Sequence, residues 1–215
     1  MARLEIDLRI TARTAVAVGA GGSAGSRVDR SIVRDAWGRP LIPGSQLKGR
    51  VRHAAEQILS AVGQDVPAHF DDERATLIRD LFGSPEHPSP LFFHDLPSTI
   101  MPEPPESITA RRLVRLRPSV ALSRRRRIAE ESLLVLQEVG AEGMIFAAEQ
   151  AICGEVPDEP QIALLWAALK LADRWGGGKS RGLGWTTVEA TIRWDGVVID
   201  EIRLAQTLRR ISGGR

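Results

Sequence analysis

Hydrophobic and polar residues alternate along the first part of the chain. From residue 3 to residue 18, apolar side chains stand at almost every second position, with charged or polar residues between them. A period of two places the apolar side chains on one face of a β-strand. We therefore expect a long or bent strand that is buried on one side. A glycine-rich loop without hydrophobic content follows at residues 19–26.

Helical periodicity appears in two longer segments. Apolar residues recur every three or four positions between Leu47 and Val62, with Ser45 as the expected N-cap and Gly63 as the stop. The same spacing over residues 162–172 predicts a second helix, which the three glycines at 176–178 end. A shorter helix is expected over residues 72–82, and another at the C-terminus.

The remaining patterns predict strands. We expect a buried strand at residues 91–95, a hairpin made of 133–139 and 144–153, and an alternating strand at 186–194 that ends in the Asp195-Gly196 turn. Residues 97–105 are rich in proline and are expected to be structureless. The resulting order is typical of an α+β sandwich of the ferredoxin or RNA-recognition type. The aromatic stacking motif of RNA-recognition domains is absent, so we do not expect bases to stack on the sheet.

Length and composition restrict the class of protein. A chain of 215 residues with 43% hydrophobic and 26% charged residues suits one globular domain. No apolar run approaches the roughly 20 residues that span a bilayer, and the N-terminus resembles no targeting peptide. The single cysteine, Cys153, excludes an internal disulfide and a multi-cysteine zinc site. We therefore expect a cytoplasmic protein without zinc and without a membrane partner.

Positive charge is concentrated in one segment. Eight arginines and no acidic residue lie between residues 107 and 129, whereas the whole chain carries a net charge of only +2. Such a block favours contact with a polyanion over a solvated loop, because soluble loops normally mix both signs of charge. Arginine also binds phosphate with two hydrogen bonds and stacks on bases. The eight residues are Arg111, Arg112, Arg115, Arg117, Arg124, Arg125, Arg126 and Arg127.

The sequence Gly-Gly-Gly-Lys-Ser-Arg-Gly-Leu-Gly at residues 176–184 is the strongest local motif. It is not a P-loop, because Asp173 stands where that motif requires glycine and because a helix precedes the loop and a strand follows it. Flexible backbone carrying Lys179 and Arg181 favours contact with a phosphate backbone. The alternative is a helix C-cap with a connecting loop.

The start of the first helix is a second candidate site for an anion. Ser45, Lys48 and Arg52 are spaced by three and four residues, so they share one helix face. The free N–H groups at a helix start favour anions, and the two cations add positive charge. The alternative is an ordinary capped helix with a basic exposed face.

Few residues could perform catalysis. Asp29 and Asp35 lie near the glycine-rich loop, where a carboxylate can orient a ribose hydroxyl, help to hold a hydrated metal ion or simply stabilise a turn. The four histidines, His53, His69, His87 and His94, have no metal-ligand spacing.

Several motifs together resemble the RAMP superfamily, and specifically the repeated backbone subunit of type III, Csm-like CRISPR effector complexes. They are the glycine-rich loop, Val-Asp-Arg-Ser-Ile-Val-Arg-Asp at 28–35, Ile-Pro-Gly-Ser-Gln-Leu-Lys-Gly at 42–49, Leu-Phe-Gly at 81–83, Pro-Ser-Val-Ala-Leu at 118–122 and Gly-Lys-Ser-Arg-Gly-Leu-Gly at 178–184. The resemblance covers nearly the whole chain.

The resemblance implies a ferredoxin-like palm, residues 1–95 and 129–215, within a single domain of residues 1–215, and a basic thumb hairpin inserted at about 96–128. Many copies would bind one CRISPR RNA beside other subunits of the complex. Asp29 would cleave bound single-stranded target RNA with a divalent metal ion, Mg or Mn, as a metal-dependent endoribonuclease. The RNA-binding residues are expected to be Gly21, Gly22, Ser45, Gln46, Lys48, Arg52, Arg111, Arg112, Lys179, Ser180 and Arg181.

Two other functions remain open from the sequence. The chain could be an RNA-binding subunit of such a complex that does not cleave the target, in which case binding would depend steeply on salt and yield no product. It could also be an endoribonuclease that processes the precursor transcript. Such enzymes commonly use histidine as a general acid or base, and His94 would be the first candidate.

Overall fold

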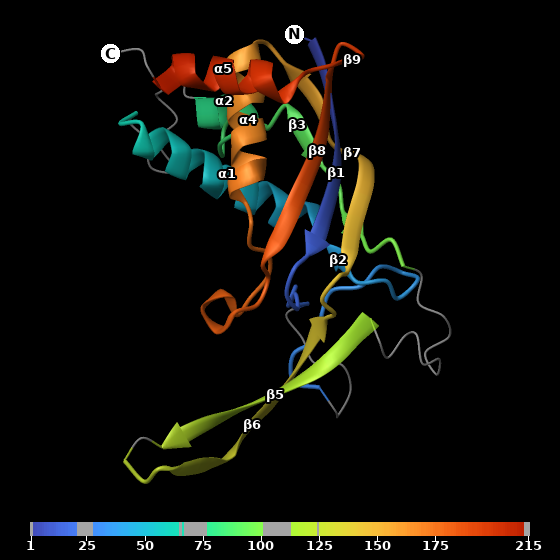
Figure 1. Ribbon diagram of the computed structural model, residues 1–215, viewed down its shortest axis with the longest axis vertical. Coiled ribbons are helices and arrows are strands. Elements are labelled where there is room, and N and C mark those ends of the chain that lie inside the picture. The colour runs from blue at the N-terminus through green and yellow to red at the C-terminus, as the bar shows by residue number, and fades with distance from the viewer. Residues whose placement is uncertain are drawn as a thin grey trace.

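The protein is an α+β protein built from antiparallel sheets (Figure 1). A computed structural model describes residues 2–20, 28–64, 66, 77–100, 113–123 and 125–212. The elements in chain order are β1 (Ala2–Ala12), β2 (Leu41–Ile42), α1 (Gly44–Ala61), α2 (Leu77–Phe82), β3 (Leu91–Phe93), β4 (Leu96–Pro97), β5 (Val114–Ser123), β6 (Ile128–Gly140), β7 (Ile145–Val156), α4 (Glu159–Leu171), η2 (Lys179–Arg181), β8 (Thr186–Trp194), β9 (Val197–Val198) and α5 (Glu201–Ser212). The main sheet has the strand order β3-β7-β1-β8-β9, while β2 pairs with β4 and β5 with β6.

The alternation at the N-terminus forms the central strand of the main sheet. In β1, Leu4, Ile6 and Ile10 are fully buried, while Arg3 and Arg9 are exposed on the opposite face. The strand ends at Ala12, earlier than predicted, and the backbone N–H groups of residues 13 and 14 both donate to the carbonyl of Trp185. Beyond this point, residues 15–20 pair with other segments of the chain.

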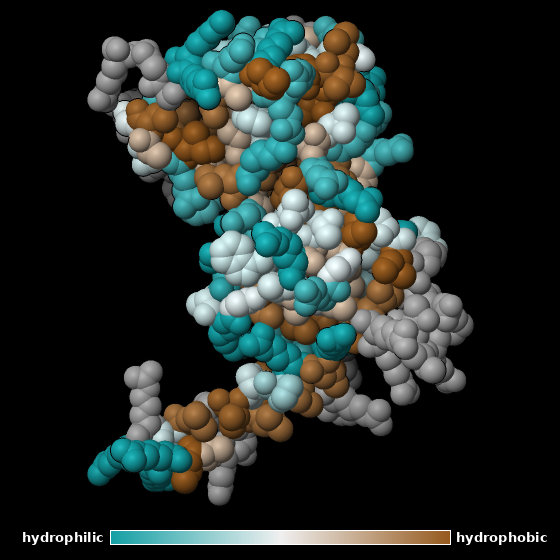
Figure 2. Space-filling model, viewed as in Figure 1, coloured by the Kyte–Doolittle hydropathy of each residue, from teal (hydrophilic) through white to brown (hydrophobic). Residues whose placement is uncertain are grey.

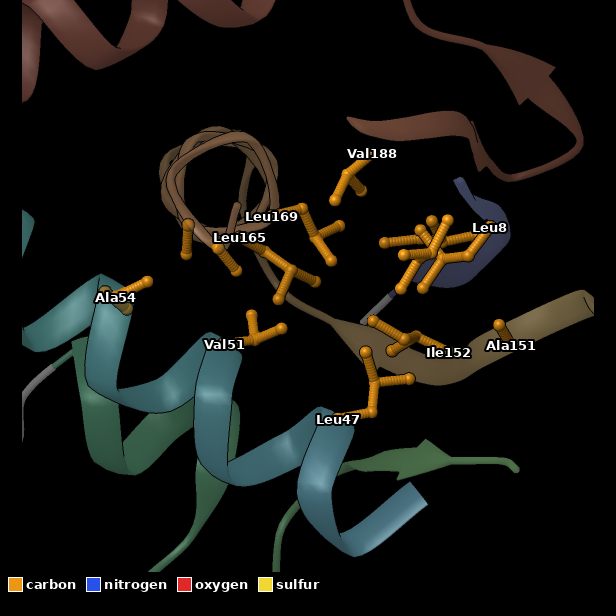
Figure 3. Close-up of a cluster of buried hydrophobic side chains, with 14 of the residues drawn as sticks. Leu8, Leu47, Val51, Ala54, Ala151, Ile152, Leu165, Leu169 and Val188 are labelled. Carbon is orange, nitrogen blue, oxygen red and sulfur yellow. The ribbon is translucent and has the colours of Figure 1, made fainter. Parts of the chain in front are cut away.

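The helices cover one face of the main sheet and leave the other face open. Figure 3 shows Leu47 and Val51 of α1 and Leu165 of α4 directed toward Leu8 and Ile152 of the sheet. Helix α4 is apolar on nearly all sides because it lies among α1, α5 and the sheet. No helix in the described part of the chain has the length and apolar character needed to cross a membrane.

The start of α1 corrects the predicted N-cap. The helix begins at Gly44 with Pro43 in the N-cap position, and Ser45 is an exposed residue of the first turn. The N–H of Gly44 instead donates to Asp95 Oδ1, a distance of 2.7 Å. A Cβ on Gly44 would lie 2.1 Å from the carbonyl oxygen of Phe93, so only glycine fits here. A distant carboxylate therefore replaces the local cap.

The predicted hairpin of residues 133–139 and 144–153 is wrong. Both segments are strands, and Gly143 has the positive φ of a turn, but β6 pairs with β5, while β7 enters the main sheet between β1 and β3. The apolar side chains of β7, such as Phe146 and Ile152, are buried there. The β5–β6 hairpin instead projects away from the main sheet (Figure 1) and continues to Gly140, past the expected end of the insertion at residue 128.

The other predicted elements agree with the structure apart from their ends. Strand β8 covers the predicted residues 186–194, and Asp195 and Gly196 adopt positive φ in the turn to β9. Helix α4 and the C-terminal helix α5 are confirmed, as is the stop at Gly63. Part of the predicted helix 72–82 lies outside the described residues, and α2 forms its end. Residues 96–97 form β4, although the proline-rich segment was expected to be structureless from residue 97.

Candidate nucleic-acid interface

Residues 15–20 form a junction between the main sheet, the hairpin and two loops. Val16 exchanges backbone hydrogen bonds with Gly140 at the base of the hairpin, of 2.7 and 3.0 Å. The carbonyl of Ala17 accepts from Gly177, and that of Val18 accepts from Val33, both at 2.8 Å. Segments that are far apart in sequence, residues 28–35 and 176–184, therefore meet at the end of the sheet where the hairpin begins.

Asp29 lies against the hairpin strand β6. Its backbone N–H donates to the carbonyl of Leu136 at 3.0 Å, and its Oδ2 accepts from the N–H of Leu136 at 2.7 Å. The side chain is otherwise exposed to solvent. One carboxylate oxygen is thus held by the backbone of β6 at an exposed position.

Glu138 joins the segment after Asp29 to the same strand. Its backbone N–H donates to the carbonyl of Arg30 at 2.9 Å. Its carboxylate accepts two hydrogen bonds from the guanidinium of Arg34, of 2.9 and 3.0 Å, and one from the N–H of Ile32, of 3.2 Å. The Glu138 side chain is only 13% exposed. Two-point pairing of this kind fixes orientation as well as distance.

Asp35 stabilises a turn. Its carboxylate accepts hydrogen bonds from the backbone N–H groups of Trp37 and Arg39 and from Arg39 Nε. Burial raises the pKa of Asp35, but the hydrogen bonds and charge of Arg39 outweigh burial, and the pKa lies below its usual value. The interpretation of Asp35 as a turn residue is confirmed. Of the two aspartates, Asp29 is the more exposed to solvent.

The glycine-rich loop is a tightly packed connection between α4 and β8. Gly176, Gly178, Gly182 and Gly184 all have positive φ, and a Cβ on Gly184 would lie 2.1 Å from the carbonyl oxygen of Trp175. Between these glycines, Lys179 begins the short helix η2, and Ser180 and Arg181 are exposed. The loop geometry therefore requires glycine, while its polar side chains remain accessible.

A cation cluster, made of Arg50, Arg174 and Lys179, lies between α1 and this loop. Burial is the main cause that lowers the pKa of Lys179, and the charges of Arg50 and Arg174 lower it further, while the charge of Asp173 partly opposes them. Arg174 stacks 3.6 Å from the ring centre of Trp185. The buried Nε of Arg50 has no hydrogen-bond partner in the structure. Crowded cations of this kind gain stability when an anion binds among them.

Only part of this cluster is predicted by the sequence. Lys179 was expected, and Gln46 lies one turn before Arg50 on the same helix face. Arg50, Arg174 and Trp185 were missed, because the predicted helix face passed through Ser45, Lys48 and Arg52 instead. The spacing of four between Gln46 and Arg50 is a signal that could have indicated the other face.

Lys48 and Arg52 belong to a separate basic group. Burial lowers the pKa of Lys48, as does the charge of Arg52, and its Nζ lies 6.0 Å from the ring centre of Phe93. Arg52 donates to Glu56 Oε1 at 2.9 Å and to the carbonyl of Gly83 at 3.3 Å. The guanidinium of Arg52 therefore has a structural role in joining α1 to the end of α2.

The hairpin has an arginine-bearing end and an apolar shaft. Arg125, Arg126 and Arg127 are exposed at its tip, and Figure 2 shows this hydrophilic end beyond a hydrophobic shaft. Near its base, Arg117 Nη2 donates to the carbonyl of Arg181 at 3.5 Å, so the hairpin and the glycine-rich loop are in contact. The expected RNA-binding residues Gly21, Gly22, Arg111 and Arg112 lie outside the described residues.

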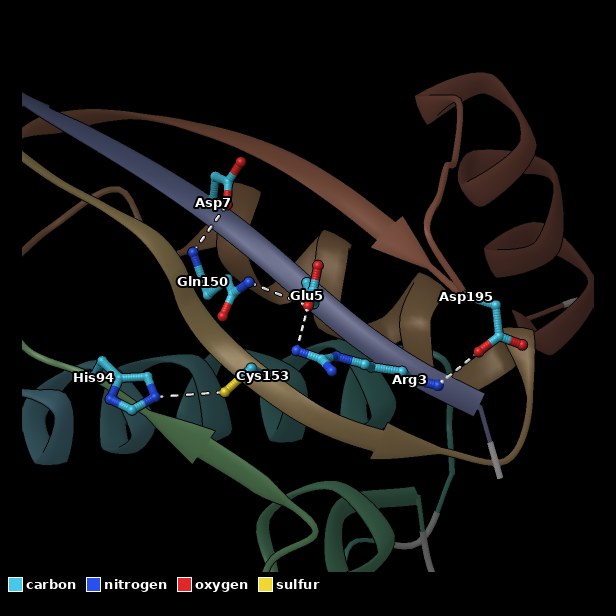
Figure 4. A network of polar contacts seen from close by, with 7 residues as sticks. All are labelled: Arg3, Glu5, Asp7, His94, Gln150, Cys153 and Asp195. Atoms are coloured by element: carbon cyan, nitrogen blue, oxygen red, sulfur yellow. Dashed lines mark hydrogen bonds and ion pairs between the residues drawn. The ribbon is translucent and has the colours of Figure 1, made fainter.

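The open face of the sheet carries a network of charged groups (Figure 4). Asp7 pairs with Arg193 and accepts from the N–H of Gln150, whose side chain donates to Glu5. At the edge of this face, Cys153 Sγ lies 3.4 Å from Nε2 of the exposed His94. In the part of the chain that the structure describes, no group of three or more His, Cys, Asp or Glu side chains could hold a metal ion.

Comparison with known proteins assigns the family. A family model described as the RAMP superfamily matches residues 9–188, and the chain therefore belongs to this superfamily. An 88-residue stretch is 38% identical to the protein named CRISPR system Cms endoribonuclease Csm3 of Mycobacterium tuberculosis (strain ATCC 25618 / H37Rv). The stretch covers 40% of this chain and 37% of that relative. The resemblance to RAMP proteins of the Csm-like type is thereby confirmed.

Proposed function

We propose that the protein is a CRISPR RNA-binding backbone subunit of a type III interference complex, present in several copies, and that it cleaves target RNA bound to the guide. The observation that carries this proposal is the junction at residues 15–20, where two segments with family motifs, residues 28–35 and 176–184, come together beside a basic hairpin. Because these segments are far apart in sequence, their convergence supports a shared ligand.

The cation cluster is the proposed site for the guide backbone. Arg50, Arg174 and Lys179 bring three positive charges to one surface, and burial keeps Lys179 partly desolvated. A phosphate there would receive charge-assisted hydrogen bonds and would relieve the repulsion among the cations. The exposed Ser180 and Arg181 extend this surface toward the base of the hairpin.

Asp29 is the proposed catalytic residue. The reaction is attack of a target ribose 2′-hydroxyl on the adjacent phosphate, which breaks the bond to the 5′-oxygen of the next nucleotide and leaves a 2′,3′-cyclic phosphate. A single carboxylate suits a hydrated Mg²⁺ or Mn²⁺ that takes its other ligands from water and RNA phosphate. Such an ion, when bound, would stabilise the charge on the phosphate. Asp29 would hold it through the oxygen that Leu136 does not occupy.

The fold supports the palm-and-thumb architecture that the resemblance implies. The strand order β8-β1-β7-β3, with α1 and α4 on one face, fits a ferredoxin-like palm, and the projecting β5–β6 hairpin fits a thumb. In this proposal, copies of the chain line up along one guide in the cytoplasm with the other subunits of the complex. Each hairpin then meets the guide–target duplex.

The test is co-expression of the chain with its companion subunits and a repeat–spacer transcript. Purified complex should contain RNAs of guide length that share one 5′ end derived from the repeat. Asp29→Ala should abolish cleavage of complementary RNA, a loss of at least about 100-fold, while guide content stays unchanged. Asp200→Ala is the matched control, because Asp200 also accepts a backbone N–H, that of Ile202. Random cellular RNA in the complex, or cleavage by the Asp29 variant, would contradict the proposal.

A further inference from the structure

The segment that carries Asp29 is held on one side by the hairpin strand β6 and on the other by residues 18–20, where the carbonyl of Val18 accepts the N–H of Val33. Within the described residues, Asp29 and Arg30 make backbone hydrogen bonds to Leu136, and Glu138 adds one to Arg30. Leu136 acts through its backbone, which substitutions other than proline leave in place. On β6, the Glu138 side chain is therefore the part of this attachment that a substitution can remove without changing the backbone.

Glu138 is placed to fix the direction in which this segment leaves the hairpin. Its carboxylate accepts the N–H of Ile32, three residues beyond Asp29, and pairs at two points with Arg34. Both partners are partly shielded from water, with side-chain exposures of 13% for Glu138 and 31% for Arg34. An ion pair that also accepts a backbone N–H restrains the chain more firmly than an exposed pair does.

We propose that Glu138, together with Arg34, is a positioning residue for target cleavage, and that it sets the place of the Asp29 carboxylate relative to the hairpin. This inference rests on the proposed function, in which Asp29 performs the cleavage. Glu138 is neither a metal ligand nor an acid–base group in this scheme, because its two oxygens are occupied by Arg34 and Ile32.

The hairpin thereby becomes part of the cleavage site. Asp29 is bonded to Leu136, and Glu138 lies two residues further along the same strand, so a shift of β6 would carry the carboxylate with it. A displacement of about 1 Å at a reacting group is enough to reduce a rate by about 100-fold. RNA that contacts the hairpin would therefore influence cleavage through this strand.

The experiment measures cleavage by the assembled complex in a single turnover, with the complex in excess over target. The variants are Glu138→Ala, Glu138→Gln, Arg34→Ala and the double alanine variant, and target affinity and guide content are measured for each. Glu159→Ala is the matched control, because Glu159 also pairs at two points with an arginine, Arg203, but on α4 and α5. Asp29→Ala is measured in parallel.

Glu138→Ala should lower the cleavage rate constant about 10- to 100-fold while target affinity changes less than about twofold. Glu138→Gln keeps an acceptor for Ile32 and should lose less activity. The double variant should be no slower than Glu138→Ala alone, because both substitutions remove the same contact. Glu159→Ala should cleave at the wild-type rate.

Two failures are distinguishable. Cleavage by Asp29→Ala would remove the proposed function and this inference together. If Asp29→Ala is inactive while Glu138→Ala and Glu138→Gln both cleave at the wild-type rate, only the positioning role is wrong. Equal losses of target affinity and of rate would also overturn it, since they would indicate a binding role. Should Glu138→Ala fail to assemble, the Gln and Arg34 variants decide the matter by the same criteria.

Discussion

The main sheet and the β5–β6 hairpin are both antiparallel, but they differ in the burial of their apolar side chains. In the sheet, Ile6 and Ile152 are fully buried beneath α1 and α4. In the hairpin, Leu116 and Leu134 are 54% and 59% exposed. The sheet is stabilised by burial, whereas a lone hairpin of two strands is at best marginally stable in water.

The hairpin therefore depends on its base. Val139 is buried at the end of β6, where it packs with Ala17 of the junction and Leu183 of the glycine-rich loop. These contacts, with the hydrogen bonds to residues 16 and 29–30, are where the hairpin joins the rest of the protein. The proposed chemical groups therefore lie where the stable and the weakly supported parts of the molecule meet.

The largest expected effect tests the contrast in burial directly. Phe146→Ala removes a buried side chain from β7 and should lower the free energy of unfolding by about 3–5 kcal/mol. Leu134→Ala in the hairpin should change it by less than about 0.5 kcal/mol, because that side chain is largely in water. Urea denaturation of both variants gives the two values. Similar losses would show that the hairpin is packed in solution against something else.

A smaller effect is expected at the loop that supports the hairpin base. Gly184→Ala should cost about 1–3 kcal/mol, because its φ is positive and its new Cβ would meet the Trp175 carbonyl. Gly177→Ala is the matched control: the nearest atom to its Cβ would lie 3.8 Å away, and its φ is not positive. Thermal denaturation compares them. Equal stability of the two variants would indicate that the loop rearranges freely.

The smallest effect on stability is expected in the cation cluster. The lowered pKa of Lys179 means that the unfolded chain holds this proton more firmly, so protonation of Lys179 opposes folding. Stability should therefore rise as the pH increases from the lowered pKa toward the ordinary value of 10.5, and Lys179→Met should remove this rise. Denaturation of both proteins over that pH range measures the difference.

The same variant should weaken RNA binding although it does not lower stability at neutral pH. Loss of one phosphate contact reduces the slope of log affinity against log salt by about 1. Arg9→Met removes the same charge from the open face of the sheet, where Arg9 lies 3.9 Å from Glu189, and should leave the slope unchanged. An unchanged slope for Lys179→Met would place the guide elsewhere.

Local patterns predicted elements whose determinants lie within the element itself. The alternation in β8 and the Asp195-Gly196 turn were found because side-chain period and positive φ are local properties. The N-cap of α1 was missed because the group that satisfies the Gly44 N–H, Asp95, is far away in the sequence. Pairing of β6 with β5 was missed for a similar reason: short segments with similar patterns can pair in more than one way.

The same distinction between local and long-range determinants applies to the candidate site. The sequence alone determined which segments carry the family motifs, because motif spacing, glycine content and the arginine block are properties of the chain order. Only the tertiary structure decided that Arg50 and Arg174 join Lys179, and that Asp29 lies on Leu136 beside the Glu138–Arg34 pair. Charge and hydrogen bonding act over a few ångströms in space, and the folded chain, rather than spacing in sequence, sets those distances.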